Sequence, residues 1–161
     1  MLFRGPDFEL RYPNNWIIAK TGDTTSLSPE DGNVDATLAY GLLADIFEPR
    51  PRNSGAEIPA GGVTAESTIS DAMDQLIEEL KRTRPNLHRL ASIQREVGGL
   101  TAIEMKLSNT SPVGGVELDR LIAVRRPNGT VRYFLAVTPQ TEENLYNPIF
   151  NKVIESIRFY N

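Results

Sequence analysis

The chain has 161 residues, the usual size of one domain, and its 40% hydrophobic and 24% charged residues exclude collagen-like, coiled-coil and wholly disordered chains. A formal net charge of −4 is the wrong sign for general attraction to phosphate backbones, so nucleic-acid binding is not expected. Cysteine is absent, which excludes disulfides, thiolate metal sites and cysteine nucleophiles but leaves the compartment open. We therefore expect a single domain over residues 1–161.

No targeting or membrane segment is expected either. No run of residues approaches the roughly 18 apolar positions that a membrane span requires. The N-terminal residues 1–6 lack the apolar core of a signal peptide and lead at once into a strand pattern.

The first third of the chain carries strand patterns. Apolar and charged residues alternate over 7–12, the period of two that is typical of a strand with one buried face. Turn residues follow, and then a second strand is predicted over 16–19 and a short third over 26–28. The nearly continuous apolar stretch 36–47 predicts a long, buried strand that bends or bulges at Gly41.

A loop and then a helix are expected in the middle of the chain. Residues 48–63 contain three prolines and three glycines without any periodicity, which indicates a long connection. Apolar residues then recur at helical spacing over 69–80, with Ser67 or Thr68 available as the N-cap. Glu78 is expected to pair with Arg82 one turn later, and the next proline ends the helix.

The second half of the chain predicts two hairpins, because turn dipeptides separate pairs of strand patterns. The paired segments are 88–97 with 100–108, and 116–126 with 131–139. A second helix is predicted with Asn147 as its N-cap and Pro148 as its first residue. The second hairpin is apolar on both faces, which requires cover on each side, and the two helices can supply it. We therefore predict an α+β fold in which an antiparallel sheet lies between helices.

Known catalytic and metal-binding motifs are missing. The single histidine, His88, is not part of the HExxH pattern that a zinc protease helix requires, and no serine sits in GxSxG. The glycine pairs do not form a phosphate-binding pattern, so they are interpreted as turns. We expect no bound cofactor and no catalytic residue set.

One partial metal motif is present. Asp31, Asn33 and Asp35 match the opening of a calcium loop, in which alternate oxygens converge on one cation. The match stops at Ala36 and Leu42, where such a loop needs glycine and a bidentate glutamate. A polar turn between strands is the alternative interpretation.

Two carboxylates two residues apart are the other candidate site. Glu117 and Asp119 share one face of a predicted strand, as paired carboxylates do in glycosidases, which suggests a hydrolase site. The alternative is structural, with Arg120, Arg125 and Arg132 neutralising them across the sheet.

Basic residues cluster around the long loop and the end of the first helix, where they could contact an acidic partner. We select as candidate interaction residues Arg50, Arg52, Ile58, Arg82 and Arg84. The loop itself and the open edge of the sheet are the expected contact surfaces, because edges offer unpaired backbone groups.

Sequence motifs at both ends resemble a known superfamily. The chain opens with a strand ending in YPNNW and closes with a helix leading to SIRF. In this it is similar to the superfamily that contains the photosystem protein PsbP and the Ran-binding import factor Mog. The segments AYGLLADIFEP, RPNL and GGVELDRLIAVRRPNG resemble the domain that follows a membrane-associated zinc metallopeptidase domain of the CAAX-prenyl-protease type in some soil bacteria. The resemblance implies an antiparallel sheet between helices and no catalytic residues in this chain.

The sequence leaves three functions open. The first is a non-catalytic module that docks on a protein partner or on a parent zinc metallopeptidase. The second is a small-molecule or lipid-binding domain with a pocket near Trp16, Tyr40 and Met73. The third is a hydrolase acting through Glu117 and Asp119.

Overall fold

The computed structural model describes residues 1–50 and 65–160, and its main element is an antiparallel sheet. The seven strands of this sheet are β3 (Trp16–Thr21), β4 (Thr24–Pro29), β7 (Gly41–Phe47), β8 (His88–Val97), β9 (Leu100–Thr110), β10 (Val116–Arg125) and β11 (Val131–Pro139). They lie in the order β3-β4-β7-β11-β10-β9-β8, so β3 and β8 form the two edges. Both predicted hairpins, β8–β9 and β10–β11, are present.

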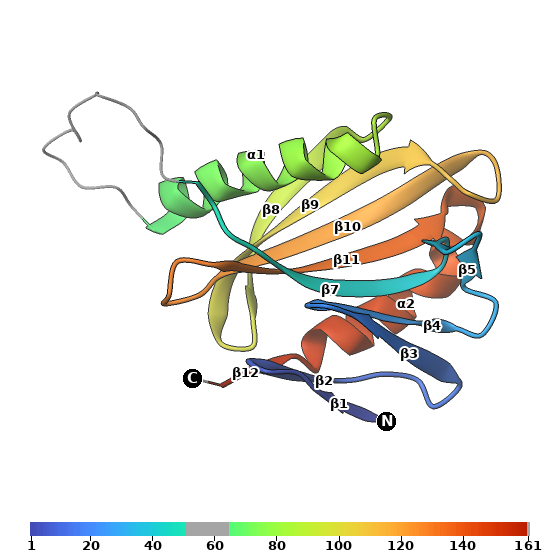
Figure 1. Cartoon of the computed structure of the whole chain (residues 1–161), viewed down its shortest axis with the longest axis horizontal. Coiled ribbons are helices and arrows are strands. Elements are labelled where there is room, and N and C mark those ends of the chain that lie inside the picture. Colours follow the sequence, from blue (N-terminus) through green and yellow to red (C-terminus); the bar gives the residue numbers. More distant parts are fainter. Residues whose placement is uncertain (51–64, 161) are drawn as a thin grey trace, which may run out of the picture.

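One helix packs on each face of the sheet. Helix α1 (Ala65–Thr83) covers one face, and α2 (Glu143–Glu155), preceded by the short helix η1 (Gln140–Glu142), covers the other. Figure 1 shows α1 running along β8, β9 and β10, with α2 on the other side of the sheet. We call these surfaces the α1 face and the α2 face. The predicted α+β arrangement is confirmed, although strands make up far more of it than helices.

Alternating residues of the central strands supply the two cores. On β10, Leu121 and Ala123 join the core under α1, whereas Ile122 and Val124 join the core on α2. All nine residues of β11 are buried, as expected for a strand that is covered on both faces. At about 25 cal/mol per Å² of apolar area removed from water, these two cores are the main stabilising contribution of the fold.

Two smaller sheets complete the molecule. Strands β1 (Leu2–Arg4), β2 (Phe8–Arg11) and β12 (Arg158–Phe159) form one, and β5 (Asn33–Val34) pairs with β6 (Thr37–Leu38) in the other. The C-terminal end is fixed to the N-terminal end, because the Tyr160 hydroxyl donates to the carbonyl oxygens of Gly5 at 3.0 Å and Phe8 at 2.7 Å. The alternating pattern over 7–12 therefore belongs to the three-stranded sheet.

The single long strand predicted over 36–47 is wrong. Asp35 and Ala36 adopt positive φ of 48° and 63°, so the chain turns there between β5 and β6. Ala39 and Tyr40, whose N–H groups both donate to the Gly32 carbonyl oxygen, then separate β6 from β7. Gly41 starts β7 instead of bending it. At φ 144° its position would place a Cβ atom 2.5 Å from the Leu27 carbonyl oxygen of β4, so only glycine fits this close approach.

Both helices begin earlier than their capping residues predicted. Ser67 and Thr68 lie within α1, which starts at Ala65, and the helix ends just before Pro85 as expected. Asn147 does not cap α2: its amide donates to the Glu143 carboxylate at 3.2 Å, one turn back, and Pro148 lies inside the helix. Helix α2 therefore starts more than one turn before the position that the preference of proline for the first helical residue predicts.

The ion pair predicted on α1 is also different. Arg82 pairs with Glu79 at 3.2 Å, whereas Glu78 lies 3.9 Å from Lys81. Both pairs are three residues apart on an exposed surface, so they contribute little to stability.

Cover on the α1 face is incomplete. The outward positions of β4 and β7 on this side, such as Ser26, Leu43 and Asp45, are only half-buried, and Ile17 of β3 is 49% exposed. The expected sealing of both faces therefore holds for β10 and β11 but not for the β3 side of the sheet.

Candidate functional site

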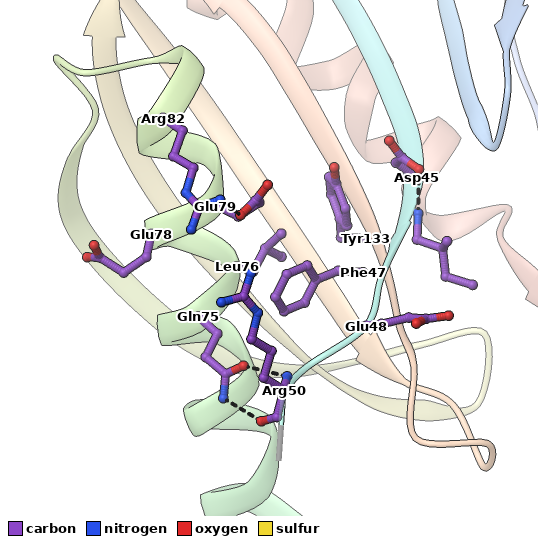
Figure 2. Close-up of a pocket in the computed structure, with 11 residues that line it drawn as sticks. Asp45, Phe47, Glu48, Arg50, Gln75, Leu76, Glu78, Glu79, Arg82 and Tyr133 are labelled. Carbon is purple, nitrogen blue, oxygen red and sulfur yellow. Dashed lines mark hydrogen bonds and ion pairs between the residues drawn. The ribbon is translucent and has the colours of Figure 1, made fainter. Parts of the chain in front are cut away.

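Two clefts open beside α1 where the helix cover ends. The first encloses about 710 Å³ between α1, β7 and β11, and we call it the α1–β7 cleft. Figure 2 shows that Arg50 reaches it from the segment after β7, while Glu79 and Arg82 reach it from α1. The backbone of Arg50 is held by the Gln75 side chain, which accepts from its N–H at 2.8 Å and donates to its carbonyl at 3.2 Å.

Asp45 and Tyr133 form the sheet side of this cleft. Asp45 accepts hydrogen bonds from Thr24 Oγ1 at 2.6 Å and from the Ile46 N–H at 2.7 Å. Burial raises the pKa of the Tyr133 hydroxyl above its usual range, and the neighbouring Asp45 carboxylate raises it further. This polar group was not singled out in the sequence, where Asp45 sits unmarked in an apolar stretch.

The second cleft lies at the C-terminal end of α1 and encloses about 680 Å³. Hydroxyl and amide side chains dominate its lining, which includes Thr21, Thr24, Ser26, Asn33, Thr37, Asn86, Asn109, Thr110 and Ser111. Its charged lining residues are Arg84 and Glu117. We call it the acid-pair cleft, because Glu117 is one member of the carboxylate pair predicted from the sequence.

The pair is present and deeply buried. Glu117 and Asp119 lie on the α1 face of β10, with relative exposures of 3% and 0%. No donor among the described residues lies in hydrogen-bonding geometry with either oxygen of Asp119. A proton shared between the two allows one carboxyl to donate to the other.

Burial decides the protonation of this pair. It raises the pKa of Asp119 to about 9, and the charge of Glu117 contributes to the same shift. Burial also raises the pKa of Glu117, while hydrogen bonding to Asp119 and the positive charge of Arg84 act in the opposite direction. At neutral pH the pair therefore holds a proton.

The arginines expected to neutralise the pair lie elsewhere. Arg120 and Arg132 point to the α2 face, where they bind Glu104 at 2.7 Å and Asp7 at 2.7 Å. Arg125 lines a hollow that also includes Asp71, at the opposite end of α1. Arg84 is instead the cation that acts on both carboxylates.

Two of the five predicted interaction residues meet in one cleft. Arg50 and Arg82 both line the α1–β7 cleft, whereas Arg84 lines the acid-pair cleft. Arg52 and Ile58 lie outside the described residues, as does most of the expected loop over 48–63.

The remaining candidates are not brought together. Trp16 packs on Phe150 in the α2-side core, Met73 lies in the α1-side core, and Tyr40 contacts Tyr146. The predicted pocket that combines Trp16, Tyr40 and Met73 is therefore wrong, because the sheet separates Met73 from the other two residues.

The partial calcium motif lies in the turn around β5. Asp31 and Asp35 are exposed, and the Asn33 amide donates to Ser28 Oγ at 3.2 Å. Within residues 1–50 and 65–160, no group of three or more acidic or histidine side chains is placed to hold a metal ion. His88 is exposed at the first position of β8.

Strand β8 presents the sheet edge that was expected as a contact surface. Its first seven residues are all exposed, including Leu90 at 54% and Ile93 at 57%, and the register shifts between Arg89 and Ala91. Each face has a hollow beside Ile93, of about 350 Å³ towards α2 and about 210 Å³ towards α1. No helix in the described part of the chain is long and apolar enough to cross a membrane.

Comparison with known proteins supports the fold. No protein-family model and no curated protein sequence matches the chain. Among solved structures, cyanobacterial PsbP (CyanoP) from Synechocystis sp. PCC 6803 is similar with a TM-score of 0.67 and 14% identity, covering 99% of this chain and 92% of that one. LpqN of Mycobacterium tuberculosis, involved in cell envelope biogenesis, is similar with a TM-score of 0.60 and 12% identity, covering 98% and 87%.

A third similar structure is PA94 from Pseudomonas aeruginosa, a protein of unknown function, with a TM-score of 0.52, 10% identity and coverage of 89% and 96%. At these identities the likeness concerns the fold and transfers no site residue. The chain has a PsbP-like fold, in agreement with the superfamily resemblance of its terminal motifs.

Proposed function

We propose that this chain is a non-catalytic accessory domain that binds a protein partner along the edge strand β8. The observation that carries the proposal is the combination of a ten-residue edge strand with two large apolar side chains, Leu90 and Ile93, that are more than half exposed. An unprotected edge of this kind is a template for an added strand from another chain.

Protective features of β8 lie outside its central segment. Charged residues usually block an edge, but Arg89 is drawn back to Asp74 at 2.8 Å and Arg95 to Glu104 at 3.4 Å. The four residues 91–94 between them carry no charge. This segment is therefore where a partner strand would pair.

The surroundings favour an extended segment as the bound element. Side chains of an added strand would alternate between the two faces and so lie over the two hollows beside Ile93. The hollow towards α2 is polar, with Lys106, Glu143 and Asn147 in its lining, whereas the hollow towards α1 includes Ile69 and Ile103. A matching segment would alternate polar and small apolar residues.

The sequence resemblance suggests which protein to test first. Similarity to a domain that follows a zinc metallopeptidase domain makes a parent peptidase, itself membrane-associated, the leading partner. This chain lacks HExxH, so we propose that any peptidase activity resides in the partner. We assign no hydrolytic role to the acid pair, because the carboxylate of Asp119 is completely buried and cannot contact a substrate.

Selection from a library of displayed random decapeptides tests the binding mode. We expect the enriched peptides, once synthesised, to protect the amides of β8 from hydrogen exchange. Ser92→Pro removes a backbone donor from the edge segment and Ile93→Lys replaces an exposed apolar side chain, so each should weaken binding at least tenfold.

The opposite edge provides the matched control. Ile17 of β3 is 49% exposed on the other edge strand, so Ile17→Lys should leave peptide binding unchanged. Enrichment of no peptide, or exchange protection at β3 in place of β8, would contradict the proposal. Co-purification with an upstream HExxH domain, lost in Ser92→Pro and retained in Ile17→Lys, would identify the parent peptidase as the partner.

A further inference from the structure

We propose that the strand added to the β8 edge carries an acidic residue on its α2-facing side, whose carboxylate Arg95 and Lys106 bind beside the hollow towards α2. This inference rests on the proposed function, because it names the chemistry of the segment that pairs with β8. The other side of the added strand, over the hollow towards α1, is expected to lack an acidic residue.

Alternation along β8 places the two binding residues on one face. Ala91 pairs with Lys106 of β9, so both side chains lie on the α2 face. Arg95 follows Ala91 by four residues in regular register and therefore lies on the same face. Because Ala91 is small, an acidic side chain of the added strand can pass over it to Lys106, which lines the hollow and whose side chain is 43% exposed. Arg95, on β8 itself, would lie within the reach of a cross-strand pair.

The ion-pair network at this hollow has an excess of positive charge. Among the described residues, it consists of Arg95, Lys106 and Arg120 with the carboxylates of Glu104 and Glu143. Three positive charges against two negative ones leave an excess of one, although the chain as a whole carries −4. One carboxylate from a partner would bring the network to neutrality, whereas an ammonium or guanidinium group would add to the excess.

Arg95 is the member of this network that can change its partner. Arg120 donates to Glu104 Oε1 through Nε at 3.1 Å and through Nη2 at 2.7 Å. Arg95 reaches the same oxygen at 3.4 Å, and its side chain is 25% exposed. Arg95 can therefore turn to a partner's carboxylate without leaving Glu104 unpaired, which would be costly at a carboxylate this buried.

The α1-facing side of β8 differs in its charge. No charged residue is found among the described residues that line the hollow towards α1. Arg89, which lies on that side of β8, is already paired with Asp74 at 2.8 Å. Glu96 is exposed on the same side and would repel a carboxylate. This difference fixes which side of the added strand is acidic.

Three libraries of displayed decapeptides test the inference. Alternate positions are restricted to Asp and Glu, to Asn and Gln, or to Lys and Arg, and the other positions vary over small apolar residues. We expect the acidic library to be enriched most, and its synthesised peptides to protect the amides of β8 from hydrogen exchange. Equal or greater enrichment of the amide or basic library, with β8 still protected, would overturn this inference and leave the proposed function standing. No enrichment from any library, or no protection at β8, would overturn both.

Substitutions then test the two binding residues. Arg95→Gln and Lys106→Gln should each weaken binding of a selected acidic peptide by about threefold to fivefold, as expected for a partly exposed ion pair. Arg89→Gln removes the same charge from the other side of β8, so it should change the affinity by less than about 1.5-fold. Replacing the acidic residues of the peptide by the matching amides should abolish the difference between the wild type and Arg95→Gln. Equal weakening by all three variants, or none by Arg95→Gln and Lys106→Gln, would overturn the assignment.

Discussion

Buried charged side chains are neutralised in different ways on the two faces of the sheet. On the α2 face, Asp7 binds Arg132 at 2.7 Å and lies 3.5 Å from Arg126, and both guanidinium groups stack on aromatic rings. On the α1 face, the oxygens of Asp119 have no partner among the described residues. The pair on the α1 face is therefore balanced by a shared proton and by the charge of Arg84, and not by direct ion pairs.

The two helices also cover their faces of the sheet to different extents. Helix α2 lies against a core rich in aromatic contacts, such as the edge-to-face pair of Phe8 and Phe134 at 5.1 Å. Helix α1 leaves part of its face open, and the clefts form there. We infer that the α2 face stabilises the domain, while the α1 face and the β8 edge remain available for binding.

Removal of a large side chain should show the greatest difference between the faces. Phe134 is fully buried on the α2 face, so Phe134→Ala should lower the free energy of unfolding by about 3–5 kcal/mol. Phe47 is half-buried beside the α1–β7 cleft, so the same change there should cost about 1–2 kcal/mol. Urea denaturation measures both values. Equal losses would show that the two faces are packed alike.

Loss of the neutralising carboxylate on the α2 face comes next in size. Asp7→Val leaves the buried guanidinium of Arg132 without its partner, so it should lower the free energy of unfolding by about 1.5–3 kcal/mol. Asp23→Val at an exposed position is the matched control and should have little effect. A stabilising effect of Asp7→Val would contradict the contrast between the faces.

The smallest effect is expected from the polar group of the α1–β7 cleft. Thr24→Val removes the 2.6 Å hydrogen bond to Asp45, which should cost about 0.5–1.5 kcal/mol because both residues are only partly buried. Thr21→Val, at an exposed position on the adjacent strand, is the comparison. Chemical denaturation would refute the assignment if the two variants were equally stable.

Sequence periodicity was sufficient for most of the architecture. The hairpins, both helices and the two-sided apolar strands could be predicted, because local pattern and burial agree over β8 to β11. The division of 36–47 could not, since it depends on the hydrogen bonds of Ala39 and Tyr40 to the Gly32 carbonyl oxygen and on the contact of Gly41 with β4. These are tertiary features without a sequence period.

The candidate site was predicted only in part. Spacing of two residues was enough to place Glu117 and Asp119 on one strand face. The same alternation excludes Arg120 as a neutralising partner of the pair, because it follows Asp119 directly and so points to the other face. That consequence was missed. Proximity of Arg84 could not be predicted, because it depends on where α1 ends above the sheet.

The most direct measurement is the free energy of unfolding of the wild-type protein and of Asp119→Val between pH 5 and pH 9. Since folding raises the pKa of Asp119 from 3.8 to about 9, the native state holds a proton that the unfolded chain releases, and the wild-type protein loses stability as pH rises. We predict that Asp119→Val is more stable than the wild type by about 1–3 kcal/mol near pH 7, and that its advantage grows with pH. A variant that is less stable than the wild type, or a difference that does not change with pH, would show that the fold already neutralises this carboxylate.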